Sequence, residues 1–147
     1  MTIRPAHPDD ATALSALSAE LGYPTPPEAI GDRLGRLLGQ SDQLVMVACD
    51  GGDAVFGWIH AAEQVLLESD RRSEILGLVV ASAHRRQGVG QQLVAAVERW
   101  TRARGLVEIS VRSNVVRTES HPFYEGMGFT RVKTQHAYRK RIGAAGA

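Results

Sequence analysis

The stretch Arg85-Arg86-Gln87-Gly88-Val89-Gly90 contains the strongest local signal in the sequence. It follows a nearly continuous apolar run at residues 74–80, which predicts a central strand covered on both faces. Apolar residues then recur at the spacing of a helix that ends near Gly105: Val89, Leu93, Val97 and Trp100. The stretch is therefore predicted to join a buried strand to the start of a long helix.

This position suits the binding of phosphate. A helix start offers unpaired N–H groups and the positive end of the helix dipole. Gly88 and Gly90 let the backbone approach an anion, and Arg85 and Arg86 add positive charge. An ordinary glycine turn with solvated arginines is the alternative. The stretch is not a Walker A motif, because no Gly-Lys-Ser/Thr follows, and it lacks the third glycine of the dinucleotide fingerprint.

The rest of the chain predicts a mixed α/β (α+β) fold in the order β-αα-βββ-α-β-α-ββ. Helix starts are marked by Asp9 and Asp10, by the capping box Thr25-Pro26-Pro27-Glu28, and by Pro122. The polar residues 63–73 are predicted to be loop. The expected strands are residues 2–5, 44–49, 55–62, 74–80 and 107–111, with two more between residues 129 and 142. We expect one domain over residues 1–142 and a flexible tail at 143–147.

Composition narrows the function classes. The chain has 147 residues, with 17 Lys and Arg against 16 Asp and Glu. This near-neutral balance gives no general attraction to nucleic acid or to an anionic membrane, and no apolar run approaches the roughly 20 residues of a membrane helix. The only cysteine, Cys49, cannot form an internal disulfide, and the first five residues lack the apolar core of a signal peptide. We expect a cytoplasmic protein that binds no metal, because no His and Cys cluster has ligand spacing.

A second motif supports a family resemblance. Arg85-x-x-Gly88-x-Gly90 resembles the signature with which the GNAT acetyltransferase family binds the pyrophosphate of coenzyme A. The segment His121-Pro122-Phe123-Tyr124-Glu125-Gly126-Met127-Gly128-Phe129 resembles the late Phe-Tyr-x-x-x-Gly-Phe segment of the same family. The resemblance implies a single GNAT-type domain, a mostly antiparallel sheet with helices on both faces, and acetyl-CoA as the acetyl donor.

The resemblance also implies roles for individual residues. Tyr124 matches the tyrosine that faces the departing thiolate and can protonate it, and Glu74 stands where many members place a general base. The backbone of one strand segment pairs with the pantetheine arm: Leu78, Val79 and Val80. The pyrophosphate loop comprises Arg85, Arg86, Gln87, Gly88, Val89 and Gly90.

One departure from the family pattern precedes Tyr124. Many members carry a cofactor-binding asparagine seven residues before the tyrosine, where this chain has Arg117, and Asn114 lies three residues earlier. Ser113-Asn114-x-x-Arg117 resembles a subset that includes aminoglycoside-modifying and small-amine enzymes. Asn114 and Arg117 are both candidates for the contact with pantetheine.

Transfer of acetyl from a thioester to an amine requires that the amine lose a proton and that the oxyanion find donors. Backbone N–H groups near Val79 are candidate donors. Glu63 and His60 are rival candidates for the general base. If Glu74 is not the base, it is a solvated residue at the end of a strand. If Tyr124 is not catalytic, it is an aromatic residue with a packing role. Tyr23 either lines the acceptor site or covers the core.

We therefore predict an N-acetyltransferase that moves an acetyl group from acetyl-CoA to a primary amine of a small molecule by direct attack. The alternatives are an acetyltransferase for protein lysines or N-termini, and a regulatory module that binds coenzyme A without turnover. Family members are often dimers, which favours a homodimer.

Overall fold

A computed structural model describes residues 1–20, 22–52, 54–112 and 120–143 of the chain. The chain divides into two compact units, Met1–Arg112 and Ser113–Ala147, and each is described by itself. Among the described residues, no helix has the length and apolar character needed to cross a membrane.

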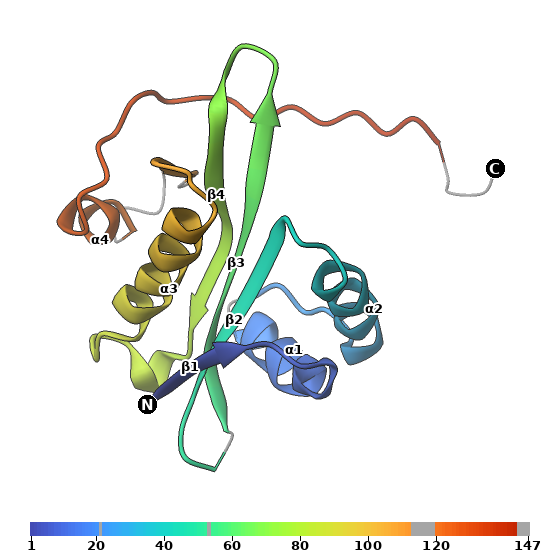
Figure 1. Ribbon diagram of the computed structural model, residues 1–147. Coiled ribbons are helices and arrows are strands. Elements are labelled where there is room, and N and C mark those ends of the chain that lie inside the picture. Colours follow the sequence, from blue (N-terminus) through green and yellow to red (C-terminus); the bar gives the residue numbers. More distant parts are fainter. Residues whose placement is uncertain (21, 53, 113–119, 144–147) are drawn as a thin grey trace. The chain divides into compact units, whose positions relative to one another are not determined.

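The first unit is built on a mixed sheet (Figure 1). Its described strands lie side by side in chain order: β1 (Thr2–Pro5), β2 (Gln43–Cys49), β3 (Val55–Leu66), β4 (Ser69–Val80) and β5 (Ile109–Val111). Neighbours are antiparallel from β1 to β4, and β5 runs parallel to β4. The expected mixed, mostly antiparallel sheet is confirmed.

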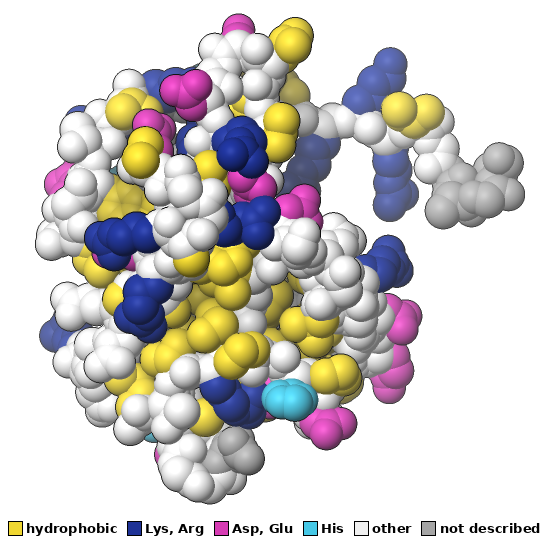
Figure 2. Space-filling model, viewed as in Figure 1, with side chains coloured by type: hydrophobic (Ala, Val, Ile, Leu, Met, Phe, Trp, Pro, Cys, Tyr) yellow, Lys and Arg dark blue, Asp and Glu magenta, His cyan; other side chains and the backbone are white. Residues whose placement is uncertain are grey.

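Helices cover both faces of this sheet, as expected (Figure 1). The helices α1 (Ala11–Glu20) and α2 (Pro27–Leu38) lie on one face, and α3 (Val89–Ala103) lies on the other. The first face holds a core of Ala6, Leu14, Leu17, Leu34, Val45 and Val47. On the second face, a Cβ added to Gly57 would lie 3.2 Å from Val89 and 3.4 Å from Leu93, so α3 packs closely on β3. Hydrophobic side chains also gather near the middle of the face shown in Figure 2.

Glycines end two helices, and the sequence predicts the end at Gly105. Gly105 has a left-handed φ of 75°, its N–H bonds Arg102 O at 3.0 Å, and the N–H of Leu106 bonds Thr101 O at 3.1 Å. These two bonds satisfy the last carbonyls of α3 in a Schellman motif. Gly22, with a φ of 86°, ends α1 in the same way.

The predicted capping box at the start of α2 does not form. Pro26 is the residue before the helix, and no side chain caps it. Thr25 Oγ1 instead donates to Tyr23 O at 3.3 Å. Two successive prolines lack the N–H groups that a capping side chain would bind near this helix start, so Thr25 has less to cap.

The predicted loop at residues 63–73 is wrong, because these residues extend β3 and β4 into a long hairpin. Gln64 pairs with Arg72 and Leu66 with Ser69, which leaves only a short turn. Polar cross-strand contacts support this part of the sheet, including one of 3.0 Å between Arg71 Nη1 and Glu63 Oε1.

In the second unit, α4 (Ser120–Gly126) begins two residues before Pro122. The two strands expected between residues 129 and 142 are absent from the described chain, whose residues 130–143 are irregular and exposed. An extended segment becomes a strand only when a neighbouring strand supplies ladder hydrogen bonds, which an alternating sequence pattern does not guarantee. The expected domain over residues 1–142 and tail at 143–147 stay predictions, and residues 144–147 lie outside the described chain.

Candidate active site

A β-bulge marks the middle of β4. His60 pairs with Gly77 and Ala61 pairs with Ile75, so Leu76 is the additional residue on β4. A bulge bends its strand and is frequent next to active sites. β5 pairs with β4 only as far as Ile75. Within the described residues of the first unit, no strand covers the β5 side of β4 after the bulge.

The pairing with β3 decides which backbone groups of β4 face this open edge. The N–H of Ala81 donates to Phe56 O at 2.8 Å. Because paired groups alternate along antiparallel strands, the backbone of Val79 is directed at β3 and that of Leu78 and Val80 at the open edge. Leu78 and Val80 are therefore positioned to pair with an added extended chain. The oxyanion donors were expected among the backbone N–H groups near Val79; the N–H of Val79 itself is directed at β3, and those of its neighbours Leu78 and Val80 at the open edge.

After β4, the chain turns sharply into α3. A short 3-10 helix, η2 (Ser82–His84), is followed by Arg86 with a φ of 63° and Gly88 with a φ of 79°. Left-handed geometry of this kind is favourable for glycine and costs a side-chain-bearing residue on the order of 1 kcal/mol. The loop between strand and helix is thus held in a conformation that few residues adopt readily.

The start of α3 fits an anion. Gly88 precedes the helix and no side chain caps it, so the first N–H groups have no partner within the helix. A Cβ added at Gly88 would meet only Gln91 Oε1, at 3.9 Å, which leaves open space in front of the helix. The side chains of Arg85, Arg86 and Gln87 are exposed beside this space. Positive charge and a helix start suit the pyrophosphate of coenzyme A.

The predicted loop residues differ in what they offer. Val89 is only 2% exposed and lies in the core, so its side chain is structural and only its backbone is available. Gly90 is half-buried at the first turn of α3. Arg85 Nε donates to Val80 O at 3.4 Å, which connects the loop to the open edge of β4.

Glu74 lies within β4, on the sheet face that also carries α1 and α2, and is only 8% exposed. It does not begin the strand, because β4 starts at Ser69. Polar and charged side chains surround its carboxylate within the sheet. The Glu74 carboxylate lies 3.3 Å from Gln64 Nε2, 3.3 Å from Ser110 Oγ and 3.7 Å from Arg112 Nε.

The two rival bases lie on opposite faces of the sheet. Glu63 points to the α3 side, where its carboxylate binds Arg104 at 2.6 Å, and this hydrogen bond holds the pKa of Glu63 below its ordinary value. His60 shares the face of Glu74 and contacts Gln43 Oε1 through Nε2 at 2.7 Å. Burial lowers the pKa of His60, which favours a neutral ring whose Nδ1 is able to accept a proton. His60 is thus the rival that shares a surface with Glu74.

The family is decided by comparison with known proteins. Residues 11–129 match the family model described as "Acetyltransferase (GNAT) family".

The chain belongs to the GNAT family.

Individual relatives agree with this assignment. An aminoglycoside N(6')-acetyltransferase type 1 of Stenotrophomonas maltophilia is 30% identical over 132 residues, which span 87% of this chain and 85% of that protein. Among solved structures, AAC(6')-Ig from Acinetobacter haemolyticus superimposes with a TM-score of 0.82 at 20% identity, over 97% of this chain and 100% of that one. AAC(6')-Iy bound to the bisubstrate analogue CoA-S-monomethyl-acetylneamine gives 0.83 at 23% identity, over 96% and 98%. Both structural likenesses concern the fold.

This GNAT protein is an acetyl-CoA-dependent N-acetyltransferase, and the predicted family, fold class and acetyl donor are confirmed. The roles of its individual residues stay predictions. Tyr124 lies in α4 of the second unit, with its ring centroid 5.1 Å from that of Phe123 and 5.7 Å from that of Phe129. Asn114 and Arg117 lie outside the described residues.

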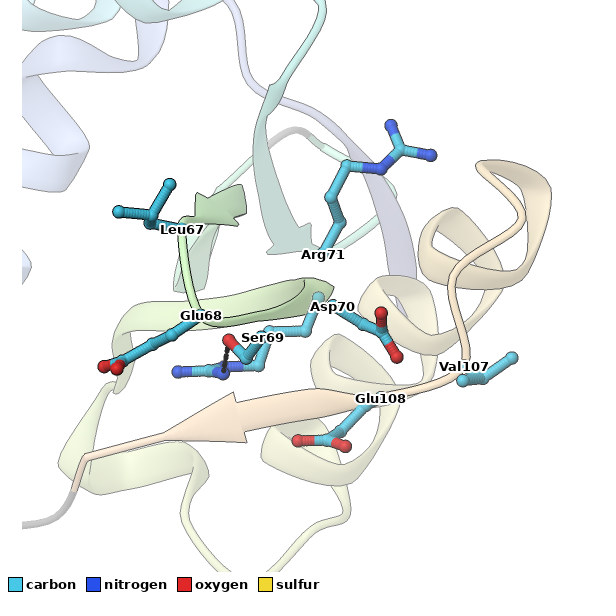
Figure 3. A pocket seen from close by; sticks show the side chains of 8 residues that line it. Leu67, Glu68, Ser69, Asp70, Arg71, Val107 and Glu108 are labelled. Atoms are coloured by element: carbon cyan, nitrogen blue, oxygen red, sulfur yellow. Dashed lines mark hydrogen bonds between the residues drawn. The ribbon is translucent and has the colours of Figure 1, made fainter.

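A separate polar pocket of about 660 Å³ lies at the end of the β3–β4 hairpin (Figure 3). It is lined by Leu67, Glu68, Ser69, Asp70, Arg71, Arg72, Val107 and Glu108, none of which is a predicted site residue of this GNAT. Arg71 is already paired with Glu63, and Arg72 contacts Ser69 and Ser110. Among the described residues, no His, Cys, Asp and Glu side chains form a group able to hold a metal ion.

The sequence does not reveal the polar partners of Glu74. Ser110 is 36 residues away along the chain and reaches Glu74 only because β5 pairs with β4. The sequence does not predict the bulge either, because Leu76 is one of several apolar residues in the strand. The bulge is evident only from the pairing of β3 and β4, in which Leu76 has no partner.

Proposed function

We propose that this enzyme acetylates a primary amine of a small molecule, and that aminoglycosides are the acceptor class to test first. The observation that carries this proposal is the likeness to the Stenotrophomonas maltophilia aminoglycoside N(6')-acetyltransferase, which extends over 85% of that protein. The relationship extends along nearly the whole length and is not confined to the segments that are predicted to bind the donor.

The donor would lie across the loop and the open edge described above. The first N–H groups of α3, with Arg85 and Arg86, would hold the pyrophosphate. The backbone groups of Leu78 and Val80 would pair with the amides of the pantetheine arm. This arrangement directs the thioester toward the bulge at Leu76, in the same strand as Glu74.

The reaction would be a direct attack. The amine nitrogen attacks the acetyl carbon to form a tetrahedral oxyanion, which an N–H group on the open edge of β4 stabilises. The carbon–sulfur bond then breaks as this intermediate collapses. The amine proton passes to Glu74, directly or through water, with His60 as the second candidate on the same face. Tyr124 would protonate the departing thiolate.

A panel of amines tests this function. Wild-type protein is mixed with acetyl-CoA and with aminoglycosides, small polyamines, lysine peptides or peptides with free N-termini, and thiol release is followed. We expect turnover with a small-molecule amine and a product heavier by one acetyl group. Turnover only with peptides would favour a protein acetyltransferase, and acetyl-CoA binding without turnover on any amine would favour the regulatory module.

A further inference from the structure

The last residue of α1 contacts the segment that leads into the pyrophosphate loop. Glu20 Oε1 accepts a hydrogen bond from the N–H of Ser82 at 2.6 Å and a second one from Ser82 Oγ. These residues are 62 positions apart in the sequence. Ser82 begins η2, which ends one residue before Arg85.

η2 is also held by β3. The rings of His84 and Phe56 are stacked, with centroids 4.2 Å apart and an angle of 7° between their planes. The N–H of Ala81 also bonds Phe56 O at 2.8 Å. Glu20 of α1 and Phe56 of β3 therefore both contact the short segment 81–84. The loop with left-handed geometry at Arg86 and Gly88 follows directly after this segment.

The negative charge of Glu20 is unfavourable for the binding of an anionic ligand nearby. Its hydrogen bonds with Ser82 hold the pKa of Glu20 below its ordinary value, so the carboxylate is ionised at neutral pH, and it lies near Arg85 and His84. A negative charge beside a loop that binds pyrophosphate repels the ligand and partly neutralises Arg85. A benefit of Glu20 to donor binding must therefore come from geometry rather than from charge.

We propose that Glu20 is a positioning residue for the donor substrate: it anchors η2 through Ser82 and thereby holds residues 85–88 in the conformation that binds the pyrophosphate of acetyl-CoA. This inference rests on the proposed role of the loop. The same residue lies two positions before Gly22, where α1 turns toward Tyr23. Glu20 thus joins the donor loop to the turn that follows α1.

The direction of the change in acetyl-CoA affinity distinguishes a geometric role of Glu20 from an electrostatic one. Removal of a carboxylate near an anion site should by charge alone tighten acetyl-CoA binding. We expect the opposite: Glu20→Ala should weaken acetyl-CoA binding, measured by calorimetry, roughly threefold to tenfold, the range for loss of an exposed hydrogen-bonded contact. The KM for the acceptor and kcat should change little. Glu20→Gln keeps an accepting oxygen and should restore most of the affinity.

Two controls make the test specific. Glu28→Ala removes an exposed carboxylate from α2 and should leave acetyl-CoA binding unchanged. S-acetylpantetheine lacks the pyrophosphate, so its kcat/KM as donor should be the same for wild type and Glu20→Ala.

Other outcomes overturn the inference. A folded Glu20→Ala protein that binds acetyl-CoA as well as wild type or better, while wild type binds normally, would refute the positioning role and leave the proposed function standing. An equal loss with S-acetylpantetheine would also refute it. If the wild type itself binds pantetheine and not the pyrophosphate portion, the loop assignment fails and this inference fails with it.

Discussion

Arg104 Nη2 lies 2.6 Å from Glu63 Oε2, so the residue at the end of α3 is joined to strand β3 by a charged hydrogen bond. Arg104 Nη1 also donates to Ser41 O at 2.7 Å, just before β2, and its guanidinium lies 5.0 Å from the ring centroid of Trp100. One side chain thus joins the end of α3 to strand β3 and to the turn before β2.

Glu63→Gln is expected to lower the melting temperature at neutral pH. Arg104 holds the pKa of Glu63 below its ordinary value, so the ion pair stabilises the fold fully above the unfolded-state pKa of about 4.3. Its contribution is lost as the pH falls through the lower pKa of the folded state, and melting curves of wild type and variant should converge in acid. Glu98→Gln is the control, because its pair with Arg102 has a longer distance, 3.7 Å, on a helix surface. A difference that is constant with pH would mean that packing, not charge, is responsible.

Gly88→Glu should weaken acetyl-CoA binding by about tenfold or more, because it places a negative charge in front of the uncapped start of α3. Gly105→Glu is a matched control. Gly105 has nearly the same φ, 75° against 79°, and no atom within 4 Å of an added Cβ. Both variants carry similar backbone strain, and only the change at Gly88 should affect calorimetric binding. Normal binding by a folded Gly88→Glu protein would refute the phosphate-loop assignment.

Tyr124→Phe should retain acetyl-CoA affinity but lower kcat by up to about a hundredfold, since the hydroxyl would act on the departing thiolate. Tyr138→Phe is the control, because this tyrosine is 90% exposed. The two variants are compared by steady-state kinetics under conditions where chemistry limits turnover. An unchanged rate for Tyr124→Phe would assign that ring to packing.

Glu74→Gln should keep the fold and acetyl-CoA affinity but cut kcat/KM by about a hundredfold or more at neutral pH. An amine with a pKa near 10.4 is mostly protonated there, and higher pH should rescue much of the loss as free amine becomes abundant. His60→Ala tests the other candidate on this face, and Glu63→Gln tests the opposite face. If Glu74→Gln has nearly normal kcat/KM and His60→Ala has a strongly reduced one, His60 is the general base. If none of the three changes matters, the proton goes to solvent.

Gly77→Ala should destabilise the fold by about 1–3 kcal/mol, because an added Cβ would lie 2.8 Å from two ring atoms of Trp58. Gly35→Ala, in α2 and with open space around it, should instead stabilise by up to about 1 kcal/mol. Chemical denaturation measures both. Equal stability of Gly77→Ala and wild type would show that the Trp58 ring moves aside at no cost.

Features of this fold that depend on residues close together in the chain are predictable from the sequence. The turn into α3 and the end at Gly105 follow from glycine placement and apolar spacing within a few residues, so both were predictable. The hairpin at residues 63–73 was missed because its strands are stabilised by polar pairs such as Arg71 with Glu63, which resemble loop composition.

The candidate site divides in the same way. The loop at residues 85–90 is contiguous, and its glycines and arginines are recognisable from sequence. The surroundings of Glu74 come from Gln64, Ser110 and Arg112, which only the sheet pairing brings together. The contact of Glu20 with Ser82 was invisible for the same reason, since it joins residues far apart in the chain.

The bulge at Leu76 has a consequence for insertions and deletions during evolution. Glu74 and Gly77 face the same side of the sheet although three positions separate them, because the additional residue offsets the alternation. Deletion of Leu76 would therefore leave every other side chain of β4 on its present face with its present partner, and would only straighten the strand. Loss of this one codon would remove the half-exposed side chain of Leu76 and change the curvature of the sheet, while the other side chains of β4 keep their faces.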